Sequence, residues 1–260
     1  MNVDKYLEKL NYRGKTNPNL DNLKKIHQKH MYSIPFENLD IHNNEKIVLN
    51  LEKVERKVIN NSRGGYCYEL NGLFFHLLKE FGYKVKMISA RVHSGNGEYG
   101  AEFDHLAIIV ELDELWLADV GFGDSFIEPV SINLNKSQKN LNGYYKISKT
   151  ESDIYPDYLK MSKTIKNNNN NDKVNFTDEF IFTLKERNWS DFEYMNNYHQ
   201  TSPDSPFTKK QLCTIANENG RITLTNQKLI LTERNEKKIT DVKDIEDFDS
   251  KLFEFFGMKL

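Results

Sequence analysis

The sequence predicts an α+β fold in which helices come first, antiparallel strands follow and a mixed region closes the chain. Apolar residues fall at helical spacing over roughly the first eighty residues. β-branched and apolar runs separated by short turns occupy most of the remainder, and one amphipathic segment ends it. Because helix and strand signals do not alternate, the pattern favours an antiparallel arrangement over repeated βαβ units.

The helical region contains several segments with start or stop signals. Apolar residues recur at helical spacing in 3–10 and 23–30, and Asn50 stands where a side chain would cap the next helix. The segment 67–81 places leucine and phenylalanine on a broad apolar face, and Gly82 follows in the position expected of a helix C-cap. A face of this breadth predicts a buried helix.

The strand signals are runs rich in β-branched and apolar residues. They cover 84–93, 105–112, 113–122, 144–148, 179–185, 211–216, 221–226 and 228–234. The letters "NENG" before Arg221 predict a hairpin turn between two of these runs. Ser190 and Glu193 have the spacing of a capping box and predict a short helix, and Gly257 ends a final amphipathic helix. An asparagine-rich run at 166–172 is interpreted as a solvated loop.

The composition fits a globular protein with an apolar core, because 38% of the residues are hydrophobic and 12% are aromatic. A formal net charge of -2 gives no basic field to attract nucleic acid, so that class of partner is not expected. No apolar run approaches the ~20 residues of a membrane-spanning helix, and the N-terminus lacks a signal-peptide core. Two cysteines make no disulfide framework. We therefore expect a cytoplasmic protein, either a monomer or a weak homo-oligomer.

Cys67 stands two residues after a glycine pair, at the start of the predicted buried helix. Unpaired backbone N–H groups and the helix dipole favour negative charge there, so a thiol ionises more easily and becomes a nucleophile. Such a nucleophile needs a base, and the base needs an orienting group. His105 opens one apolar strand and Asp119 ends the next, so a hairpin would bring imidazole and carboxylate together. Each residue also has a plainer interpretation: a buried inert thiol, a hydrogen-bonded strand histidine and a turn aspartate.

Five segments carry recognisable motifs. They are "SIPFENLDIH", "RGGYCYELNGLF" around Cys67, "DHLAIIV" around His105, "ADVGFGDSF" around Asp119 and "YHQTSPDSPFTKKQLC" in the last third. Together they resemble the motifs of the arylamine N-acetyltransferase family. The motifs follow the family's order at suitable spacing from residue 31 to about 213, which makes the resemblance far more specific than any single motif.

This resemblance implies a helical bundle over 1–83, a central antiparallel β-barrel over 84–187 and an α/β lid over 188–260, with a catalytic core like that of papain-type cysteine proteases and transglutaminases. It implies acetyl transfer from acetyl-CoA, as co-substrate, to the nitrogen of arylamines or hydrazines or the oxygen of arylhydroxylamines. The transfer would follow a ping-pong course through an acetyl-cysteine and would need no metal. Xenobiotic metabolism is the family-level expectation, and a biosynthetic role is equally compatible with the sequence.

The resemblance also assigns roles to single residues. Cys67 would accept the acetyl group, His105 would act as the base and Asp119 would orient His105. Apolar walls of the acceptor pocket would come from Phe36, Val92 and Phe122, for which ordinary core packing is an equal alternative.

Other residues are assigned supporting roles. Contacts to CoA would come from Gly121, Gly123, Tyr198, Ser205 and Phe207. Hydrogen bonds that support the site would come from Arg63, Glu69 and Asn71. Of these, Asn71 is expected to steady the His105–Asp119 pair, and Arg63 to form an ion pair with Glu37.

Two other functions stay open from the residues alone. A hydrolase or transglutaminase would use the same three side chains on an amide, although the "PFENL" and "TSPDSPF" segments argue against it. A non-catalytic binding module would not need Cys67, His105 and Asp119, and all three are present. The physiological acceptor and the acyl-chain preference are not predicted.

Overall fold

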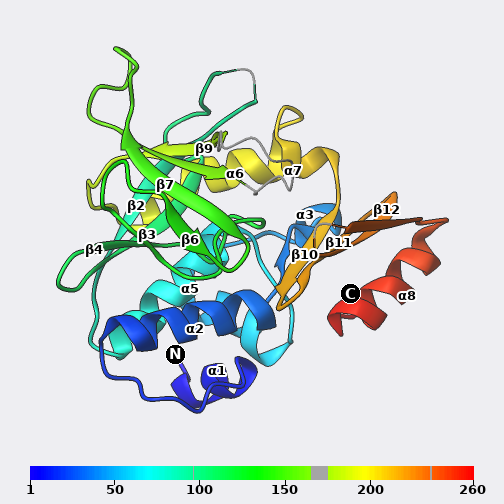
Figure 1. Cartoon of the computed structure of the whole chain (residues 1–260). Coiled ribbons are helices and arrows are strands. Elements are labelled where there is room, and N and C mark those ends of the chain that lie inside the picture. Colours follow the sequence, from blue (N-terminus) through cyan, green and yellow to red (C-terminus); the bar gives the residue numbers. More distant parts are fainter. Residues whose placement is uncertain (96, 165–174, 235) are drawn as a thin grey trace.

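The computed structural model describes residues 1–95, 97–164, 175–234 and 236–260, so the predicted asparagine-rich loop at 166–172 lies outside the described residues. Figure 1 shows the N-terminal helices below an eight-stranded sheet, and a five-stranded sheet with the C-terminal helix to one side. The predicted α+β class is confirmed.

The N-terminal region folds into helices of different lengths. They are α1 (Val3–Lys9), α2 (Leu20–Ser33), α3 (Leu39–His42), α4 (Leu51–Glu55), the π-helical turn η1 (Arg56–Asn60) and α5 (Cys67–Glu80). Asn50 caps α4 by accepting a hydrogen bond from the Lys53 N–H, so the predicted cap is confirmed. Gly82 follows α5 with a φ of +79°, the left-handed conformation that glycine adopts without strain.

One short strand in this region has no counterpart in the sequence patterns. Strand β1 (Phe36–Glu37) pairs antiparallel with β10 (Leu212–Asn217), with Phe36 opposite Thr214. Two residues are too few to produce a recognisable alternation of apolar and polar positions. The pairing joins the helical region to the C-terminal sheet and fixes the place of Phe36 between them.

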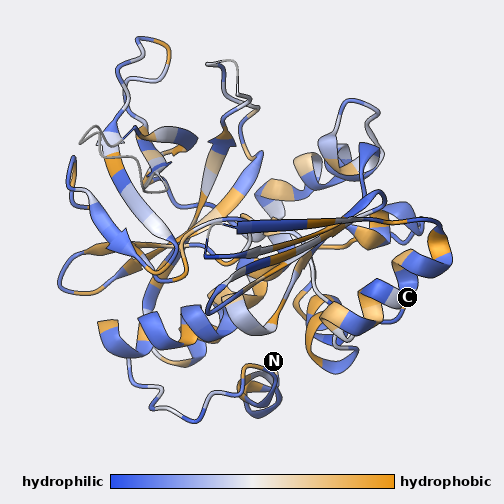
Figure 2. Ribbon diagram, turned by 45° about the vertical axis from the view of Figure 1, so that its right-hand side comes forward, coloured by the Kyte–Doolittle hydropathy of each residue, from blue (hydrophilic) through white to orange (hydrophobic). Residues whose placement is uncertain are grey.

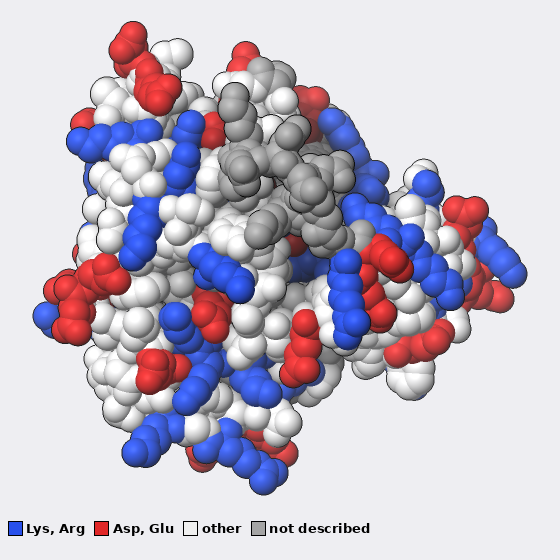
Figure 3. Space-filling view, viewed as in Figure 1, with Lys and Arg blue, Asp and Glu red and all other residues white. Residues whose placement is uncertain are grey.

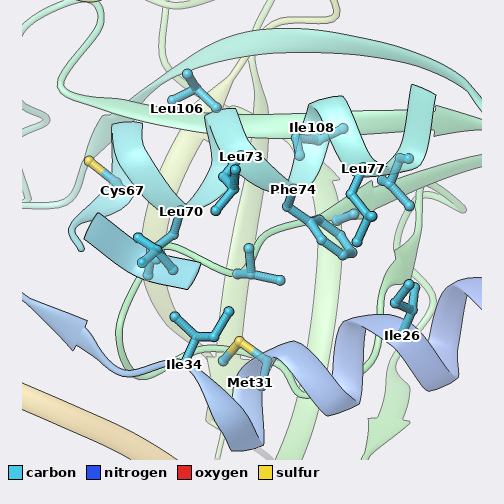
Figure 4. Packing of buried hydrophobic residues seen from close by; sticks show 14 of the residues in the cluster. Ile26, Met31, Ile34, Cys67, Leu70, Leu73, Phe74, Leu77, Leu106 and Ile108 are labelled. Atoms are coloured by element: carbon cyan, nitrogen blue, oxygen red, sulfur yellow. The ribbon is translucent and has the colours of Figure 1, made fainter. Parts of the chain in front are cut away.

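Helix α5 lies in a large apolar core. Its fully buried side chains include Leu70, Leu73, Phe74, Leu77 and Leu78. They pack between α2 and the strands β2 (Lys84–Val92) and β3 (His105–Glu111), as Figure 4 shows. Burying each such side chain stabilises the fold by about 1.5–3 kcal/mol. The prediction of a buried helix is confirmed, and α5 gives Cys67 a rigid support.

The central strands form an antiparallel sheet that curls into a nearly closed barrel. In spatial order they are β5 (Val130–Ser131), β4 (Leu115–Ala118), β3, β2, β9 (Thr177–Phe182), β8 (Leu159–Thr164), β7 (Gly143–Lys149) and β6 (Gln138–Asn140). Side chains join the two end strands: the Gln138 amide accepts from the Ser131 N–H at 2.9 Å and donates to the Ser131 carbonyl at 2.7 Å. These bonds replace the ladder that a fully closed barrel would have.

The hairpin of β3 and β4 brings two predicted site residues to one place. The strands pair antiparallel with Ile108 opposite Ala118. In that register His105, the first residue of β3, and Asp119, the residue after β4, lie at the same end of the hairpin. The predicted hairpin is confirmed.

The C-terminal region contains short helices and the second sheet. The helices are η2 (Trp189–Phe192), α6 (Glu193–Thr201), α7 (Pro206–Lys209) and α8 (Ile245–Phe256). The sheet has the order β1, β10, β11 (Gly220–Thr225), β12 (Lys228–Glu233) and β13 (Glu236–Asp241). The "NENG" hairpin between β10 and β11 is confirmed. Helix α8, whose hydrophilic and hydrophobic stretches alternate in Figure 2, buries Phe248 and Leu252 and ends at Gly257 as predicted.

Some local predictions are wrong or incomplete. Strands β5, β6, β8 and β13 are not among the predicted runs, because they are short or rich in polar residues. The capping box lies two residues earlier than predicted: Asn188 and Asp191 form it, and Asp191 accepts from the Asn188 N–H at 2.8 Å. The reason is the turn η2, which starts the helical segment before Ser190.

The surface carries both kinds of charge. On the face shown in Figure 3, acidic and basic side chains are interspersed, in agreement with the net charge of -2. Within the described part of the chain, none of the helices has the length and apolar character needed to cross a bilayer. The predicted boundaries after residues 83 and 187 fall between α5 and β2 and between β9 and η2, and the division into domains stays a prediction.

Candidate active site

Cys67 is the first residue of α5, and only 3% of its surface is exposed. Figure 4 shows its sulfur at the N-terminal end of the helix, directed away from the apolar residues that follow. Neither Gly64 nor Gly65 has a positive φ, so their importance is space and not a special turn. A Cβ atom on Gly64 would overlap the Pro35 carbonyl oxygen, and one on Gly65 would lie 2.9 Å from the Cβ of Glu69.

The surroundings of the Cys67 thiol act on its pKa in opposite directions. Burial raises the pKa well above its usual value, and the negative charges of Asp119 and Asp104 raise it further. The backbone N–H groups of Leu106 and of Tyr68, in the first turn of α5, donate toward the sulfur and lower the pKa. The expected effect of the helix entrance is therefore present but outweighed. Ionisation of Cys67 requires a base inside the site that accepts its proton.

The imidazole of His105 is held by Asp119. Its Nε2 lies 2.7 Å from the Asp119 Oδ2, and the two side chains are almost fully buried. Because an ionised carboxylate only accepts, Nε2 carries the hydrogen and Nδ1 is the nitrogen that remains to accept a proton. The rings of Phe122 and Phe180 pack around the imidazole. These contacts fix the orientation of His105 in the cavity that Cys67 also lines.

Further hydrogen bonds hold the carboxylate of Asp119. Its Oδ1 accepts from the Asn71 Nδ2 at 2.8 Å and from the Gly121 N–H at 2.9 Å. The Asn71 amide also donates to the Leu106 carbonyl at 2.6 Å and accepts from the Val120 N–H at 2.9 Å. The buried Asn71 thus ties α5 to β3 and to the segment that follows β4, and the contact expected between Asn71 and Asp119 is present.

Cys67 and His105 line a cavity of about 920 Å³, which lies within the usual range for small-molecule sites. The residues expected to contact acceptor or CoA that line this cavity are Phe36, Val92, Gly121, Phe122, Gly123 and Phe207. The rings of Phe36 and Phe207 lie 6.1 Å apart at their centroids, so they form an aromatic part of the wall. Apolar and aromatic walls of this kind suit a flat ring.

Tyr198 and Ser205 are not among the described residues that line this cavity. Ser205 is fully buried, and its Oγ donates to the His199 carbonyl at 3.0 Å and accepts from the Phe207 N–H at 3.2 Å. Ser205 therefore caps α7, while Tyr198 packs half-buried against the core. The predicted contacts of these two residues with CoA have no support in this geometry.

A second imidazole–carboxylate pair lines the same cavity, and the sequence patterns do not single it out. The Nε2 atom of His199 lies 3.2 Å from the Oδ1 of Asp104, and His199 is buried. Asp104 directly precedes His105, which is the one signal that marks it in the sequence. His199 comes from α6, almost a hundred positions later, and its pairing depends on the tertiary fold.

Arg63 and Glu69 do not line the cavity but belong to a partly buried ion network behind Cys67. Arg63 Nη2 lies 2.9 Å from a Glu37 oxygen and 2.7 Å from an Asp40 oxygen, so the expected ion pair with Glu37 is present. Arg63 and Glu69 thus support the entrance of α5 from behind and do not face a substrate.

Lys57 is the second cation of this network. Its Nζ lies 2.9 Å from a Glu69 oxygen and 2.7 Å from an Asp40 oxygen. Glu69 also accepts from the N–H of Tyr66 at 3.1 Å, immediately before Cys67. The network therefore fixes the backbone that leads into α5.

Comparison with known proteins gives consistent results. A family model described as N-acetyltransferase matches residues 19–260. The arylamine N-acetyltransferase pineal gland isozyme NAT-10 of Gallus gallus is 33% identical over 252 residues, which cover 93% of this chain and 87% of that protein. Arylamine N-acetyltransferase 1 of Homo sapiens is 30% identical over 275 residues, which cover 100% of this chain and 95% of that protein.

Solved structures resemble the fold over the same extent. The arylamine N-acetyltransferase of Salmonella typhimurium superposes with a TM-score of 0.88 at 26% identity, covering 98% of this chain and 90% of that one. The Mycobacterium marinum arylamine N-acetyltransferase in complex with CoA superposes with a TM-score of 0.87 at 25% identity, covering 99% and 93%. The likeness includes the helices, the barrel and the five-stranded sheet together.

Proposed function

This chain belongs to the arylamine N-acetyltransferase family, and on that premise we propose how it transfers an acetyl group. It is an acetyltransferase with arylamines as its acceptors. We propose that acetyl-CoA is the donor and that the acetyl group rests on Cys67 between two half-reactions. The observation that carries the proposal is one shared cavity, lined by a thiol and by an imidazole that a carboxylate holds in one orientation.

In the first half-reaction the sulfur of Cys67 attacks the carbonyl carbon of the acetyl-CoA thioester. The proton of the thiol passes to Nδ1 of His105, and Asp119 stabilises the resulting imidazolium. The tetrahedral oxyanion then collapses, the bond between carbon and the CoA sulfur breaks, and the CoA thiolate takes the proton from His105. One thioester has replaced another, so the step has little uphill cost.

In the second half-reaction an arylamine nitrogen attacks the carbonyl carbon of acetyl-Cys67. His105 accepts the proton that the nitrogen loses, the C–S bond to Cys67 breaks, and the sulfur leaves as a thiolate that His105 reprotonates. The oxyanion of each step needs N–H donors, and the backbone N–H of Cys67 is the candidate because it lies in the first helical turn.

The cavity wall supports the choice of substrates. Phe36, Val92 and Phe122 offer apolar surface to an aromatic acceptor. The nitrogen of hydrazines and the oxygen of arylhydroxylamines are proposed as further acceptor atoms. Gly121, Gly123 and Phe207 line the same cavity, and we propose that they contact the arm of CoA that carries the thioester. Both cysteines are free thiols, and a thiol catalyst favours a reducing compartment such as the cytoplasm.

Intact-mass measurement after mixing the protein with acetyl-CoA tests the proposal. We expect one acetyl group on the wild type, none on Cys67→Ala and one on Cys213→Ala, the matched control at the other buried free cysteine. An arylamine should then discharge the adduct and appear acetylated. A folded wild type that acquires no adduct would overturn the proposal, and release of ammonia from amides without CoA would favour the hydrolase instead.

A further inference from the structure

A buried histidine of α2 contacts the backbone of Asp119. His27 is fully buried, its Nδ1 lies 2.8 Å from the Ile127 carbonyl oxygen, and its Nε2 lies 3.1 Å from the Asp119 N–H. We propose that His27 is a positioning residue that fixes Asp119, and through Asp119 the imidazole of His105, for acetyl transfer. This inference rests on the function proposed above.

The two partners determine the tautomer of His27. The Ile127 carbonyl only accepts, so Nδ1 carries the hydrogen, and the Asp119 N–H only donates, so Nε2 presents its lone pair. Burial lowers the pKa of His27 to about 4, against the opposing influence of these two residues, which keeps the ring neutral near pH 7. A neutral ring with one donor and one acceptor matches both partners at once.

Aromatic neighbours hold the ring in this orientation. Phe126 stacks on His27 with ring centroids 5.7 Å apart, and Phe74 of α5 meets it edge-on at 5.8 Å. The ring therefore has little freedom to turn away from its hydrogen-bond partners. His27 joins three parts of the molecule: α2, α5 and the segment that follows β4.

The position of Asp119 explains why its N–H needs this partner. Strand β4 ends at Ala118, so the N–H of Asp119 lies beyond the strand ladder, in a residue that is fully buried. A buried N–H without an acceptor is costly, and the chain would shift to satisfy it. Asn71 holds the carboxylate of Asp119 from α5, and His27 holds its backbone from α2. Two helices thus fix the residue that orients His105.

The same helix offers a matched control. His30 follows His27 by one turn, is equally buried and packs against the same Phe74 ring at 5.3 Å. Neither of its ring nitrogens has a hydrogen-bond partner among the residues that the structure describes. Substitution of His30 therefore disturbs the packing of α2 but removes no hydrogen bond to Asp119.

The experiment compares His27→Leu, His27→Gln and His27→Asn with His30→Leu. The rate of Cys67 acetylation is measured at saturating acetyl-CoA, together with the half-saturating concentration and the melting temperature. The side-chain amide of glutamine lies near the position of Nε2, so its oxygen can accept from the Asp119 N–H. The amide of the shorter asparagine lies near the position of Nδ1 and reaches only the Ile127 carbonyl. We expect His27→Leu and His27→Asn to slow acetylation by roughly 10- to 100-fold, with the half-saturating concentration changed by less than about threefold.

Rescue separates positioning from stability. His27→Gln should acetylate within about threefold of the wild type, and His30→Leu should match the wild type even where its melting temperature falls as far as that of His27→Leu. If His27→Leu does not fold, the comparison of the glutamine and asparagine variants still tests the inference. Equal rates for these two variants would overturn it, as would equal rates for His27→Leu and His30→Leu. A wild type that forms no acetyl-Cys67 would instead refute the proposed function, so the two failures differ.

Discussion

A Cβ atom on Gly121 would lie 2.8 Å from the Cα atom of Cys67, so the segment after β4 touches the first turn of α5 without room for a side chain. The same Cβ would lie 2.9 Å from the Cys67 carbonyl oxygen. Backbone atoms of a helix cannot move aside as a flexible side chain can. Asp119, two residues before Gly121, contacts His105 of β3 and Asn71 of α5, so this close approach lies beside the residue that orients His105.

We expect Gly121→Ala to separate these two backbones and to slow acetylation of Cys67 by at least about tenfold. Overpacking of this kind also costs about 1–3 kcal/mol of stability. The control is Gly257→Ala at the end of α8, where φ is +65° and a Cβ atom meets nothing within 4 Å. It should cost about 1–2 kcal/mol through backbone strain and leave the acetylation rate unchanged. Equal rates in the two variants, measured by intact mass over time, would contradict the prediction.

The pH dependence of Cys67 alkylation tests whether His105 takes the thiol proton. In the wild type we expect alkylation to stay fast at pH values well below about 8.5, the pKa of a free thiol. The reason is that proton transfer from Cys67 to His105 leaves a thiolate beside an imidazolium. Without the imidazole, burial and the charges of Asp119 and Asp104 raise the pKa of Cys67. His105→Ala should therefore move the alkylation midpoint above that of a free thiol. A profile that does not change between wild type and variant would show that the two groups do not interact.

Asp104 acts on the same thiol through its charge. Burial is the main cause of the raised pKa of Cys67, but Asp104 contributes to it, so Asp104→Asn should lower that pKa. The alkylation midpoint is then expected to move to lower pH than in the wild type. Asp178→Asn is the control, because its carboxylate pairs with Lys160 on β8 and does not line the cavity that Cys67 lines. A shift toward higher pH in Asp104→Asn would contradict this sign.

Local patterns in the sequence predicted the part of the site that depends on neighbouring elements. His105 opens one strand and Asp119 directly follows the next, so two apolar runs and one short turn suffice to bring them together. Cys67 at the start of an apolar helix is likewise visible from its own segment. The family motifs added the expectation that these elements meet.

Contacts between distant segments were not predictable in the same way. The pairing of β1 with β10 and the contact of His199 with Asp104 join segments far apart in the chain, and no local spacing encodes them. The motif that contains Ser205 was recognised, but the capping of α7 by Ser205 was not predicted from it. The sequence alone does not distinguish a serine that caps a helix, as Ser205 caps α7, from a serine that contacts a ligand.

The ion network behind Cys67 predicts an unusual dependence of stability on pH. Its three carboxylates are Glu37, Asp40 and Glu69, and they share the two cations Lys57 and Arg63. Burial raises the pKa of Glu69 from 4.5 to about 7, with Lys57 opposing and the other two carboxylates assisting. The three carboxylates raise the pKa of Lys57, so Lys57 stays protonated. Lys57 alone does not offset the burial of Glu69, because it is shared with Glu37 and Asp40.

The sign of the effect follows from proton binding. Between about pH 4.5 and 7 the folded protein holds a proton on Glu69 that the unfolded chain has lost, so this group reduces stability as the pH rises. Glu69→Gln can still accept from the Tyr66 N–H and does not ionise, so it should be more stable than the wild type above pH 7, by about 1 kcal/mol or more. Below about pH 4.5 the two should be similar, because Glu69 is then protonated in both states. Melting temperatures across this range measure the difference.

Asp40→Asn is the matched variant, and its effect on stability at neutral pH should be opposite to that of Glu69→Gln. Burial alone would raise the pKa of Asp40, but Lys57 and Arg63 outweigh it and lower the pKa. Its ionised form therefore stabilises the fold above the unfolded pKa, and that contribution is lost as the pH falls through the folded pKa. We expect Asp40→Asn to melt below the wild type at neutral pH, where Glu69→Gln melts above it. If both substitutions destabilise the protein equally at neutral pH, the network holds no excess negative charge and the protonation assigned to Glu69 is wrong.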